Sequence, residues 1–284
     1  MSADFTNVTI LGGGLLGGSL ALALEPSATN TRLWARRPAT VDEARTLGIN
    51  ATADLADAVR AADLLVLSVP VGAMPDLLTR AIAAGLPASC LVTDVGSVKQ
   101  TPHQTLAPLL AAHGSPFIGS HPMAGSERTG LAATSADLFQ NAACLLTNDN
   151  QAPRPLADAL DRFWQSVGCR TSWTSAAEHD ALVARISHLP HLIAASAARI
   201  CLEKPDHGEF GGGGLRDTTR VAAGHTGMWA EILTENSAAI TGPLRQTIAD
   251  LTEILHILET PDQVAAQTWL DKAKQLRDTL PPQR

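Results

Sequence analysis

Val8-Thr9-Ile10-Leu11-Gly12-Gly13-Gly14-Leu15-Leu16-Gly17 is the stretch of sequence that decides the fold. A short run typical of a buried strand leads into the glycine pattern GxGxxG and then into an Ala/Leu-rich helical segment. In that context Gly12 permits a tight turn, Gly14 lets the backbone approach a pyrophosphate, and Gly17 permits close helix packing. A merely flexible glycine turn is the alternative. The expected contacts of a dinucleotide with this loop are Gly12, Gly14, Leu15, Leu16 and Gly17.

Short apolar runs alternate with helical stretches through the first half of the chain. Alternation of strand and helix predicts βαβ units and therefore a doubly wound parallel sheet. Such sheets bind ligands beyond the carboxyl ends of their strands, so we expect functional residues directly after the apolar runs. The predicted strands cover residues 8–11, 32–35, 64–69, 91–94 and 117–119.

The second half of the chain has a different pattern, because from Ala176 onward apolar residues recur at helical spacing. We predict an α/β dinucleotide-binding domain over residues 1–174 and an all-helical domain over residues 175–284. The main interruption is segment 203–214, where Pro205 and four consecutive glycines break any helix and predict a loop. The apolar surface of such a helical domain is suited to dimerisation.

Composition limits the partners of this chain. Its 284 residues are 45% hydrophobic and 17% charged, which is typical of a globular protein. The net charge of −7 gives no footprint for nucleic acid, so local cations must attract any anionic ligand. The four cysteines are widely spaced and predict neither a zinc site nor a disulfide framework. No segment reaches the roughly 18 unbroken apolar residues of a spanning helix, so we expect a cytoplasmic protein without membrane contact.

The end of the second predicted strand bears on the choice of cofactor. An NAD-binding domain usually presents Asp or Glu there to the ribose hydroxyls, whereas this chain has Ala35-Arg36-Arg37. Two guanidinium groups can hold a 2′-phosphate, so we predict NADP in preference to NAD, with Arg36 and Arg37 as its ligands. A solvated pair of arginines is the alternative. Ser68, near the end of the third predicted strand, is a further candidate cofactor contact.

Two polar side chains follow later strands. Ser97 lies in Asp94-Val95-Gly96-Ser97-Val98-Lys99, where it is predicted either to cap the next helix or to offer its hydroxyl to a substrate or catalytic group. His121 follows the next predicted strand, in a segment rich in turn formers. An imidazole with a pKa of about 6.5 can accept a hydroxyl proton at neutral pH, as dehydrogenation of an alcohol requires. Glu127 and Arg128 follow closely enough to adjust its electrostatics.

The helical half contains two polar clusters. His188 and His191 share a helix face, and Pro190 between them should kink or open the turn. Their spacing differs from that of a zinc-binding HExxH motif, so we predict anion binding or packing and no metal. Asp217 and Arg220 are one helical turn apart. They predict either an exposed ion pair or an arginine that binds a substrate carboxylate.

Together these motifs resemble the prephenate dehydrogenase family, which includes the arogenate and cyclohexadienyl dehydrogenases of tyrosine biosynthesis. The resemblance implies oxidative decarboxylation of prephenate to 4-hydroxyphenylpyruvate with hydride transfer to NADP, in a homodimer formed through the helical domain. Arogenate, which would give tyrosine directly, is the alternative substrate. The resemblance rests on Gly12 to Gly17, Asp94 to Lys99, His121-Pro122-Met123-Ala124-Gly125, Ser187 to His191, and Thr219-Arg220-Val221-Ala222 with Trp229.

The resemblance also implies a role for each candidate residue. His121 would accept the hydroxyl proton, and Ser97 would orient this histidine and touch the same hydroxyl. His191 and Arg220 would hold the carboxylates of the substrate. Glu127 and Asp217 would pair with Arg220 to gate entry, and Trp229 would complete the substrate site.

Two other protein classes stay open at this point. A β-hydroxyacid or 6-phosphogluconate-type dehydrogenase also joins a dinucleotide-binding domain to a helical one, but it relies on a lysine in the helical domain. The one lysine between residues 100 and 271 is Lys204, which lies beside a proline in the glycine-rich segment. A nonenzymatic NADP-sensing protein would keep the glycine loop but would have no use for His121.

Overall fold

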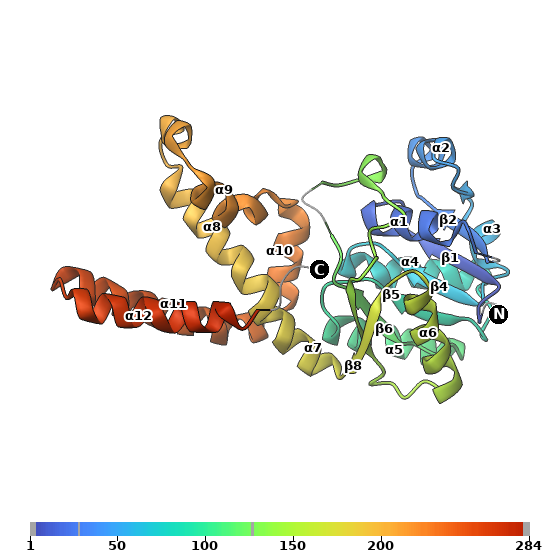
Figure 1. The fold of residues 1–284 in the computed structure, drawn as a ribbon. Coiled ribbons are helices and arrows are strands. Elements are labelled where there is room, and N and C mark those ends of the chain that lie inside the picture. The colour runs from blue at the N-terminus through green and yellow to red at the C-terminus, as the bar shows by residue number, and fades with distance from the viewer. Residues whose placement is uncertain (1–3, 28, 126–127, 281–284) are drawn as a thin grey trace. The chain divides into compact units, whose positions relative to one another are not determined.

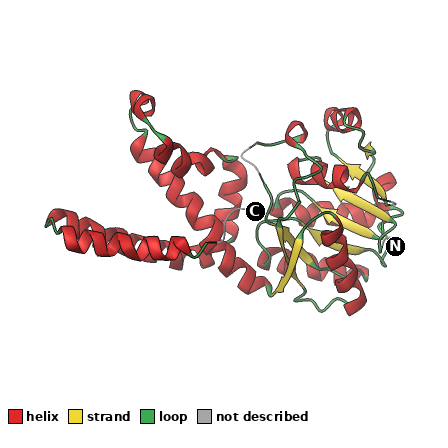
Figure 2. Ribbon diagram, in the orientation of Figure 1, coloured by secondary structure: helices red, strands yellow, loops and turns green. Residues whose placement is uncertain are grey.

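The structure, a computed structural model, describes residues 4–27, 29–125 and 128–280 (Figure 1). The chain divides into two compact units, Met1–Ser237 and Ala238–Arg284. The first unit contains a five-stranded and a three-stranded sheet with helices, whereas the described part of the second is helical (Figure 2). The predicted fold class, a parallel α/β sheet followed by helices, is confirmed.

The larger sheet is parallel and buried. Its central strand β1 pairs with β2 on one side and β4 on the other, so the chain winds outward in both directions from β1. The strand order reverses between β1 and β4, and ligands of such sheets bind at that reversal, beyond the carboxyl ends of the strands. In spatial order the strands are β3 (Ala51–Thr52), β2 (Asn30–Trp34), β1 (Asn7–Leu11), β4 (Leu64–Leu67) and β5 (Leu91–Asp94).

A helix follows each of these parallel strands along the chain, and local signals start several of these helices. Gly14 occupies the N-cap position of α1, directly after the glycine loop. The carboxylate of Asp54 accepts hydrogen bonds from the first N–H groups of α3, which makes it a side-chain cap. Both α2 and α4 have proline in the first turn, where its missing N–H costs nothing. The helices are α1 (Leu15–Leu24), α2 (Pro38–Thr46), α3 (Leu55–Val59), α4 (Met74–Ala83) and α5 (Gln100–His113).

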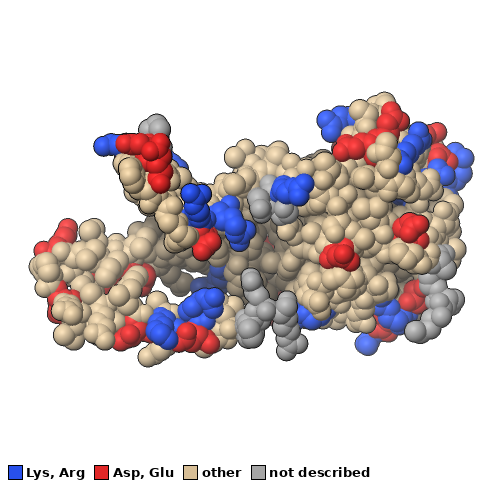
Figure 3. All heavy atoms as spheres, turned by 45° about the horizontal axis from the view of Figure 1, so that its top comes forward, with Lys and Arg blue, Asp and Glu red and all other residues tan. Residues whose placement is uncertain are grey.

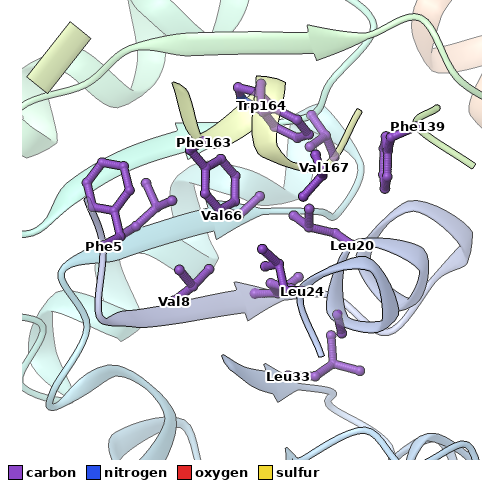
Figure 4. Packing of buried hydrophobic residues seen from close by; sticks show 14 of the residues in the cluster. Phe5, Val8, Leu20, Leu24, Leu33, Val66, Phe139, Phe163, Trp164 and Val167 are labelled. Carbon is purple, nitrogen blue, oxygen red and sulfur yellow. The ribbon is translucent and has the colours of Figure 1, made fainter. Parts of the chain in front are cut away.

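Apolar side chains from the larger sheet and from α6 (Arg154–Ser166) pack into one buried core (Figure 4). Phe163 and Trp164 of α6 meet edge to face, with ring centroids 5.4 Å apart, and Phe163 lies near Val66 of β4. The indole Nε1 of Trp164 donates to the Ser120 hydroxyl at 2.9 Å. The polar edge of this large core residue is therefore satisfied by the segment that carries the predicted base.

The smaller sheet differs from the single parallel sheet that was predicted. Strand β6 (Gly119–Pro122) runs antiparallel to β7 (Ala143–Thr147), which in turn pairs in parallel with β8 (Arg170–Thr174). Phe117 makes only an isolated parallel bridge to β5, so the strand expected at 117–119 begins two residues later. Apolar runs indicate that a strand exists but not which way it runs or which sheet it joins. Consequently His121 lies within a strand and not after one.

The chain from Ala176 onward is helical wherever it is regular, as its periodicity predicts. Ser175 and Glu178 form a capping box at the start of α7. The predicted loop at the glycine run is wrong in part, because a 3₁₀ helix covers Pro205–Phe210 and α9 already begins at Gly213. The helices are α7 (Ala176–Val183), α8 (Leu189–Cys201), α9 (Gly213–Thr219), α10 (Thr226–Glu235), α11 (Ser237–Glu259) and α12 (Gln263–Asp278).

The surface carries charges of both signs. On the face shown in Figure 3, acidic and basic side chains lie close together over the region of α2, so neither sign dominates there. Within the described residues, no helix combines the length and the apolarity that crossing a membrane requires.

Candidate functional site

The glycine loop has the geometry that a phosphate-binding turn requires. Gly12 has a φ of +132°, and a Cβ there would lie 2.1 Å from the backbone oxygen of Ser68. A Cβ at Gly17 would lie 2.0 Å from the carbonyl oxygen of Gly12, so only glycine lets α1 approach the loop. A Cβ at Gly14 would meet no atom within 4 Å, which leaves space before α1. These residues fit a dinucleotide pyrophosphate at a helix N-terminus. The other predicted contacts surround the loop: Leu15 and Leu16 begin α1, and Ser68 follows β4.

A cavity of about 400 Å³ opens beside that loop and reaches the end of β2. The predicted ligands Arg36 and Arg37 line it and are exposed. Arg80 of α4 also lines the cavity. Its guanidinium lies 5.9 Å from the centroid of Trp34 and 3.8 Å from the carboxylate of Asp76. Three guanidinium groups against one carboxylate give the cavity an electropositive lining. Motif reasoning missed Arg80, because only the folded sheet brings α4 to this place.

The predicted base His121 is buried in β6 and is held by two residues of α7. Its Nδ1 lies 2.8 Å from Nε2 of His179, and Nδ1 of His179 lies 2.8 Å from Oδ1 of Asp180. Neither partner was predicted. The adjacent His-Asp pair is visible in the sequence, but it belongs to no motif, and 58 residues separate the two histidines. The fold therefore supplies the groups that orient His121.

Burial determines the protonation of these histidines. It holds the pKa of His121 well below its usual range, and the neighbouring His179, Lys99 and His188 lower that pKa further. Burial also lowers the pKa of His179, although its hydrogen bond to Asp180 opposes the shift. At neutral pH both imidazoles are uncharged, which is the form that accepts a proton.

A fully buried ion pair between Lys99 and Asp94 lies under β6. Oδ2 of Asp94 also accepts the N–H of Gly96 at 2.9 Å, and its Oδ1 accepts the N–H of Ser120 at 3.2 Å. A Cβ at Gly119 would lie 2.9 Å from Cδ of Lys99, so glycine makes room for the lysine stem. Burial lowers the pKa of Lys99, whereas Asp94 opposes that shift. Both charged residues lie in the motif quoted from the sequence, but no role was predicted for them.

Ser97 does not cap α5, so of the two roles predicted for it the capping role is wrong. Lys99 occupies the N-cap position, and the carboxylate of Asp180 accepts the N–H groups of Lys99 at 2.7 Å and of Gln100 at 3.0 Å. A side chain from α7 thus satisfies the donors that a local cap would have taken. Ser97 is half-buried two residues earlier, and in the described part of the chain no hydrogen bond joins it to His121. Its catalytic role stays a prediction.

The histidine segment of the helical part forms a second cluster. A π-helical turn, Ala184–His188, precedes Pro190, so the helix widens where the proline was expected to open it. His191 stacks on Trp229 with ring centroids 3.5 Å apart and an interplanar angle of 9°. Burial lowers the pKa of His191, whereas the backbone of Val221, the residue after Arg220, opposes that shift. The structure therefore brings His191, Trp229 and the Arg220 segment together.

The remaining predicted substrate contacts are Asp217, Arg220 and Glu127. Asp217 in α9 and Arg220 after it are both exposed, and Glu127 lies outside the described residues. Within the described residues, Nε2 of His188 and Nδ1 of His191 are buried without a hydrogen-bond partner. The same part of the chain contains no group of three His, Cys, Asp or Glu side chains that could hold a metal ion.

Comparison with known proteins gives matches along nearly the whole chain. Residues 20–173 match the nucleotide-binding domain of prephenate dehydrogenase, and residues 175–278 match the dimerization domain of prephenate dehydrogenase. The cyclohexadienyl dehydrogenase of Zymomonas mobilis is 36% identical over 268 residues, which cover 91% of this chain and 90% of that protein.

Two solved structures are similar over nearly their full length. The prephenate dehydrogenase of Aquifex aeolicus, in complex with hydroxyphenyl propionate and NAD+, has a TM-score of 0.85 and 26% identity over 98% of each chain. The arogenate dehydrogenase of Synechocystis has a TM-score of 0.79 and 26% identity, and the match covers 96% of this chain and 99% of that one.

Proposed function

This chain belongs to the prephenate dehydrogenase family of tyrosine biosynthesis and is an oxidoreductase that uses a nicotinamide dinucleotide; we propose that it converts prephenate to 4-hydroxyphenylpyruvate with NADP. The observation that carries the proposal is the buried imidazole of His121, which meets His179 at 2.8 Å and belongs to the same compact unit as the glycine loop. Burial lowers its pKa, which favours the uncharged form. A dehydrogenase acting on a hydroxyl group needs such a base beside its cofactor.

The reaction requires the protein to move one proton and to bind two carboxylates. A nicotinamide ring held by the glycine loop would supply the hydride acceptor for the ring carbon that bears the hydroxyl. His121 takes the hydroxyl proton, and the ring carboxylate leaves as carbon dioxide while its bonding electrons enter the ring. His121 then returns the proton to the phenolate oxygen, so the base ends the cycle unchanged. Arg220 binds a substrate carboxylate, His191 serves as second ligand, and Ser97 contacts the hydroxyl.

The preference for prephenate rests on the carboxylates of α10, the helix that also carries Trp229. Prephenate has a keto group on its side chain where arogenate has an amino group. The ammonium of arogenate would need an acidic residue as its partner. Glu231 accepts the N–H of Gly72 at 2.6 Å, and Glu235 accepts the hydroxyl of Thr101 at 2.6 Å, so both already have hydrogen-bond partners. Glu127 and Asp217 are assigned to pairing with Arg220. Arogenate is the second candidate, because the similar Synechocystis protein is an arogenate dehydrogenase.

A single assay tests this assignment. The purified protein is offered prephenate or arogenate with NADP or NAD, and reduced nicotinamide is followed by absorbance. His121→Asn should lower kcat while leaving substrate binding intact, whereas Arg220→Ala should chiefly raise KM for the substrate. Turnover of arogenate alone would replace the proposed substrate. Turnover of neither would overturn the proposed reaction.

The preference for NADP rests on the electropositive cavity at the end of β2. Charge-assisted hydrogen bonds are worth about 1.5–3 kcal/mol each, so losing one should weaken binding of a 2′-phosphate about 10- to 100-fold. We expect Arg36→Ala and Arg80→Ala each to raise KM for NADP by such a factor and to leave KM for NAD nearly unchanged. Arg60→Ala, an exposed arginine outside the cavity lining, is the matched control. Equal effects on both cofactors would refute the NADP assignment.

We also propose a homodimer that forms through the helical domain, residues 175–284. The matching family model is a dimerization domain, and helix α11 leaves large apolar side chains more than half exposed. Sedimentation equilibrium should give a dimer, and Leu255→Glu should shift it toward monomer. A monomeric wild-type protein would contradict the proposal. The exposed apolar residues of α11 are Ile248, Leu251, Leu255 and Leu258.

A further inference from the structure

A chain of hydrogen bonds runs from the predicted base to a buried carboxylate. Nδ1 of His121 meets Nε2 of His179 at 2.8 Å, and Nδ1 of His179 meets Oδ1 of Asp180 at 2.8 Å. The exposed fractions of the three residues are 7%, 0% and 1%, so water does not compete for these contacts. The three ring nitrogens that form these two contacts each meet one partner, which makes the direction of each hydrogen bond decidable.

The carboxylate fixes the first proton. Burial raises the pKa of Asp180, but hydrogen bonds from His179 and from the N–H groups of Gln100 and Lys99 outweigh burial and lower it overall. Asp180 is therefore ionised and can only accept, so Nδ1 of His179 carries a proton. A neutral imidazole has one N–H, and the lone pair of His179 accordingly lies on Nε2.

The tautomer of His121 follows from that of His179. Because Nε2 of His179 can only accept, Nδ1 of His121 must donate to it, and the lone pair of neutral His121 lies on Nε2. We infer that His179 and Asp180 are positioning residues that hold His121 in the tautomer whose Nε2 accepts the proton of the substrate hydroxyl. The identity of that hydroxyl rests on the proposed function, whereas the tautomer does not.

The proton balance of the reaction suits a closed chain. The hydroxyl O–H bond breaks as the Nε2–H bond forms, hydride leaves for the nicotinamide, and carbon dioxide departs without a proton. The phenolate oxygen then recovers the proton from Nε2. Since no net proton is released, the chain needs no exit to solvent. During the cycle the imidazolium of His121 keeps its bond to His179, and the charge of Asp180 stabilises it through that ring.

Several hydrogen bonds hold Asp180, the last residue of this hydrogen-bond chain, in place. Its carboxylate accepts the N–H groups of Lys99 and Gln100 at the start of α5. Its backbone oxygen accepts Nδ2 of Asn236 at 2.9 Å, and the same amide lies 3.1 Å from Nδ1 of His188. Two separate parts of the chain thus hold the α7 segment that carries His179.

Long-range ¹H–¹⁵N correlation spectra of the full-length protein, labelled with ¹⁵N-histidine, test the inference directly. The signals of His121 are identified by their loss in His121→Asn. We expect a protonated Nδ1 and a bare Nε2 in the wild type. His179→Gln should preserve this tautomer, because its amide supplies one acceptor and one donor, whereas His179→Leu should give a mixture. His113→Leu, which removes a half-buried histidine that contacts Ser115, is the matched control.

Kinetics provide the second readout. His179→Leu should lower kcat roughly 100-fold, in the range of a lost general-base contribution, with KM for the cofactor unchanged, and His179→Gln should stay within about tenfold of wild type. A proton on Nε2 of wild-type His121, or a leucine variant with wild-type tautomer and kcat, overturns the inference. If the leucine variant does not fold, the wild-type and glutamine spectra decide. If the protein turns over no cyclohexadienyl substrate, the proposed function fails while the spectra still decide the tautomer.

Discussion

Replacing Lys99 by methionine removes one half of the buried ion pair under β6. Lys99 and Asp94 are both 0% exposed, so the carboxylate left behind could not turn to solvent. Removing one partner of a buried pair costs about 3–5 kcal/mol, because the other charge stays uncompensated. Asp94 would keep its N–H donors from Gly96 and Ser120, so we expect the lower end of this range, about 3 kcal/mol.

Thermal unfolding measures this loss. For a protein of this size each kcal/mol shifts Tm by roughly 2–4 °C, so Lys99→Met should unfold about 6–12 °C below wild type. Lys274→Met is the matched control, because it removes an exposed lysine that pairs with Asp278, and such pairs are worth about 0–1 kcal/mol. The double variant with Asp94→Asn should recover much of the lost stability, since it no longer buries an unpaired charge.

The same substitution should change the pH profile. The charge of Lys99 lowers the pKa of His121, in addition to the larger effects of burial and of His179. Without that charge the pKa of His121 rises, and because the base works unprotonated, the acid limb of kcat/KM should move to higher pH. A variant as stable as Lys274→Met, with its acid limb unmoved, would refute the role of the buried pair.

Three further predictions follow from the described contacts. Burial lowers the pKa of His121, His179, His188 and His191, that of His188 to about 4, so the unfolded state binds more protons below pH 6.5. The free energy of unfolding should therefore fall between pH 6.5 and 4, and a flat denaturation series would contradict this. Gly224→Ala places a Cβ 2.6 Å from Nε1 of Trp229 and should displace it from His191, raising substrate KM about 3- to 10-fold. Gly242→Ala, whose Cβ would meet nothing within 4 Å, is its control, and equal kinetics would argue against the stack. Gly14→Ala should weaken dinucleotide binding with Tm unchanged, whereas Gly17→Ala should lower both, as calorimetry can show. Loss of stability in Gly14→Ala would mean that the loop is packed differently.

The parallel sheet could be predicted because its signals are local. The run 91–94 coincides with β5, and the run 8–11 differs from β1 by one residue. Glycine spacing after β1 and apolar alternation act within a few residues of the chain, and tertiary contacts only reinforce them. The direction of β6 is different in kind. It depends on where β7 joins, and no residue of the run 117–119 encodes that.

The site residues likewise divide into those that the local sequence predicts and those that only the fold brings to the site. Arg36 and Arg37 could be chosen because they follow β2, whose end faces the ligand crevice. His121 could be chosen because it follows an apolar run of the sequence, although it lies within β6. Arg80, His179 and the cap of α5 could not. Arg80 reaches the cofactor cavity only through the packing of α4, and Asp180 reaches the N–H of Lys99 across 81 residues of sequence.

The wrong prediction at Ser97 and the missed partner of His121 have one cause, the carboxylate of Asp180. Its Oδ1 meets both Nδ1 of His179 and the N–H of Lys99, and its Oδ2 accepts the N–H of Gln100. A group that both starts a helix and orients a base couples stability to catalysis. Asp180→Asn would bring an amide N–H₂ against at least one of these donors, so it should lower Tm and kcat together. His179→Leu leaves the carboxylate that caps α5 in place, so it should separate the two effects: kcat should fall roughly 100-fold while Tm stays above that of Asp180→Asn.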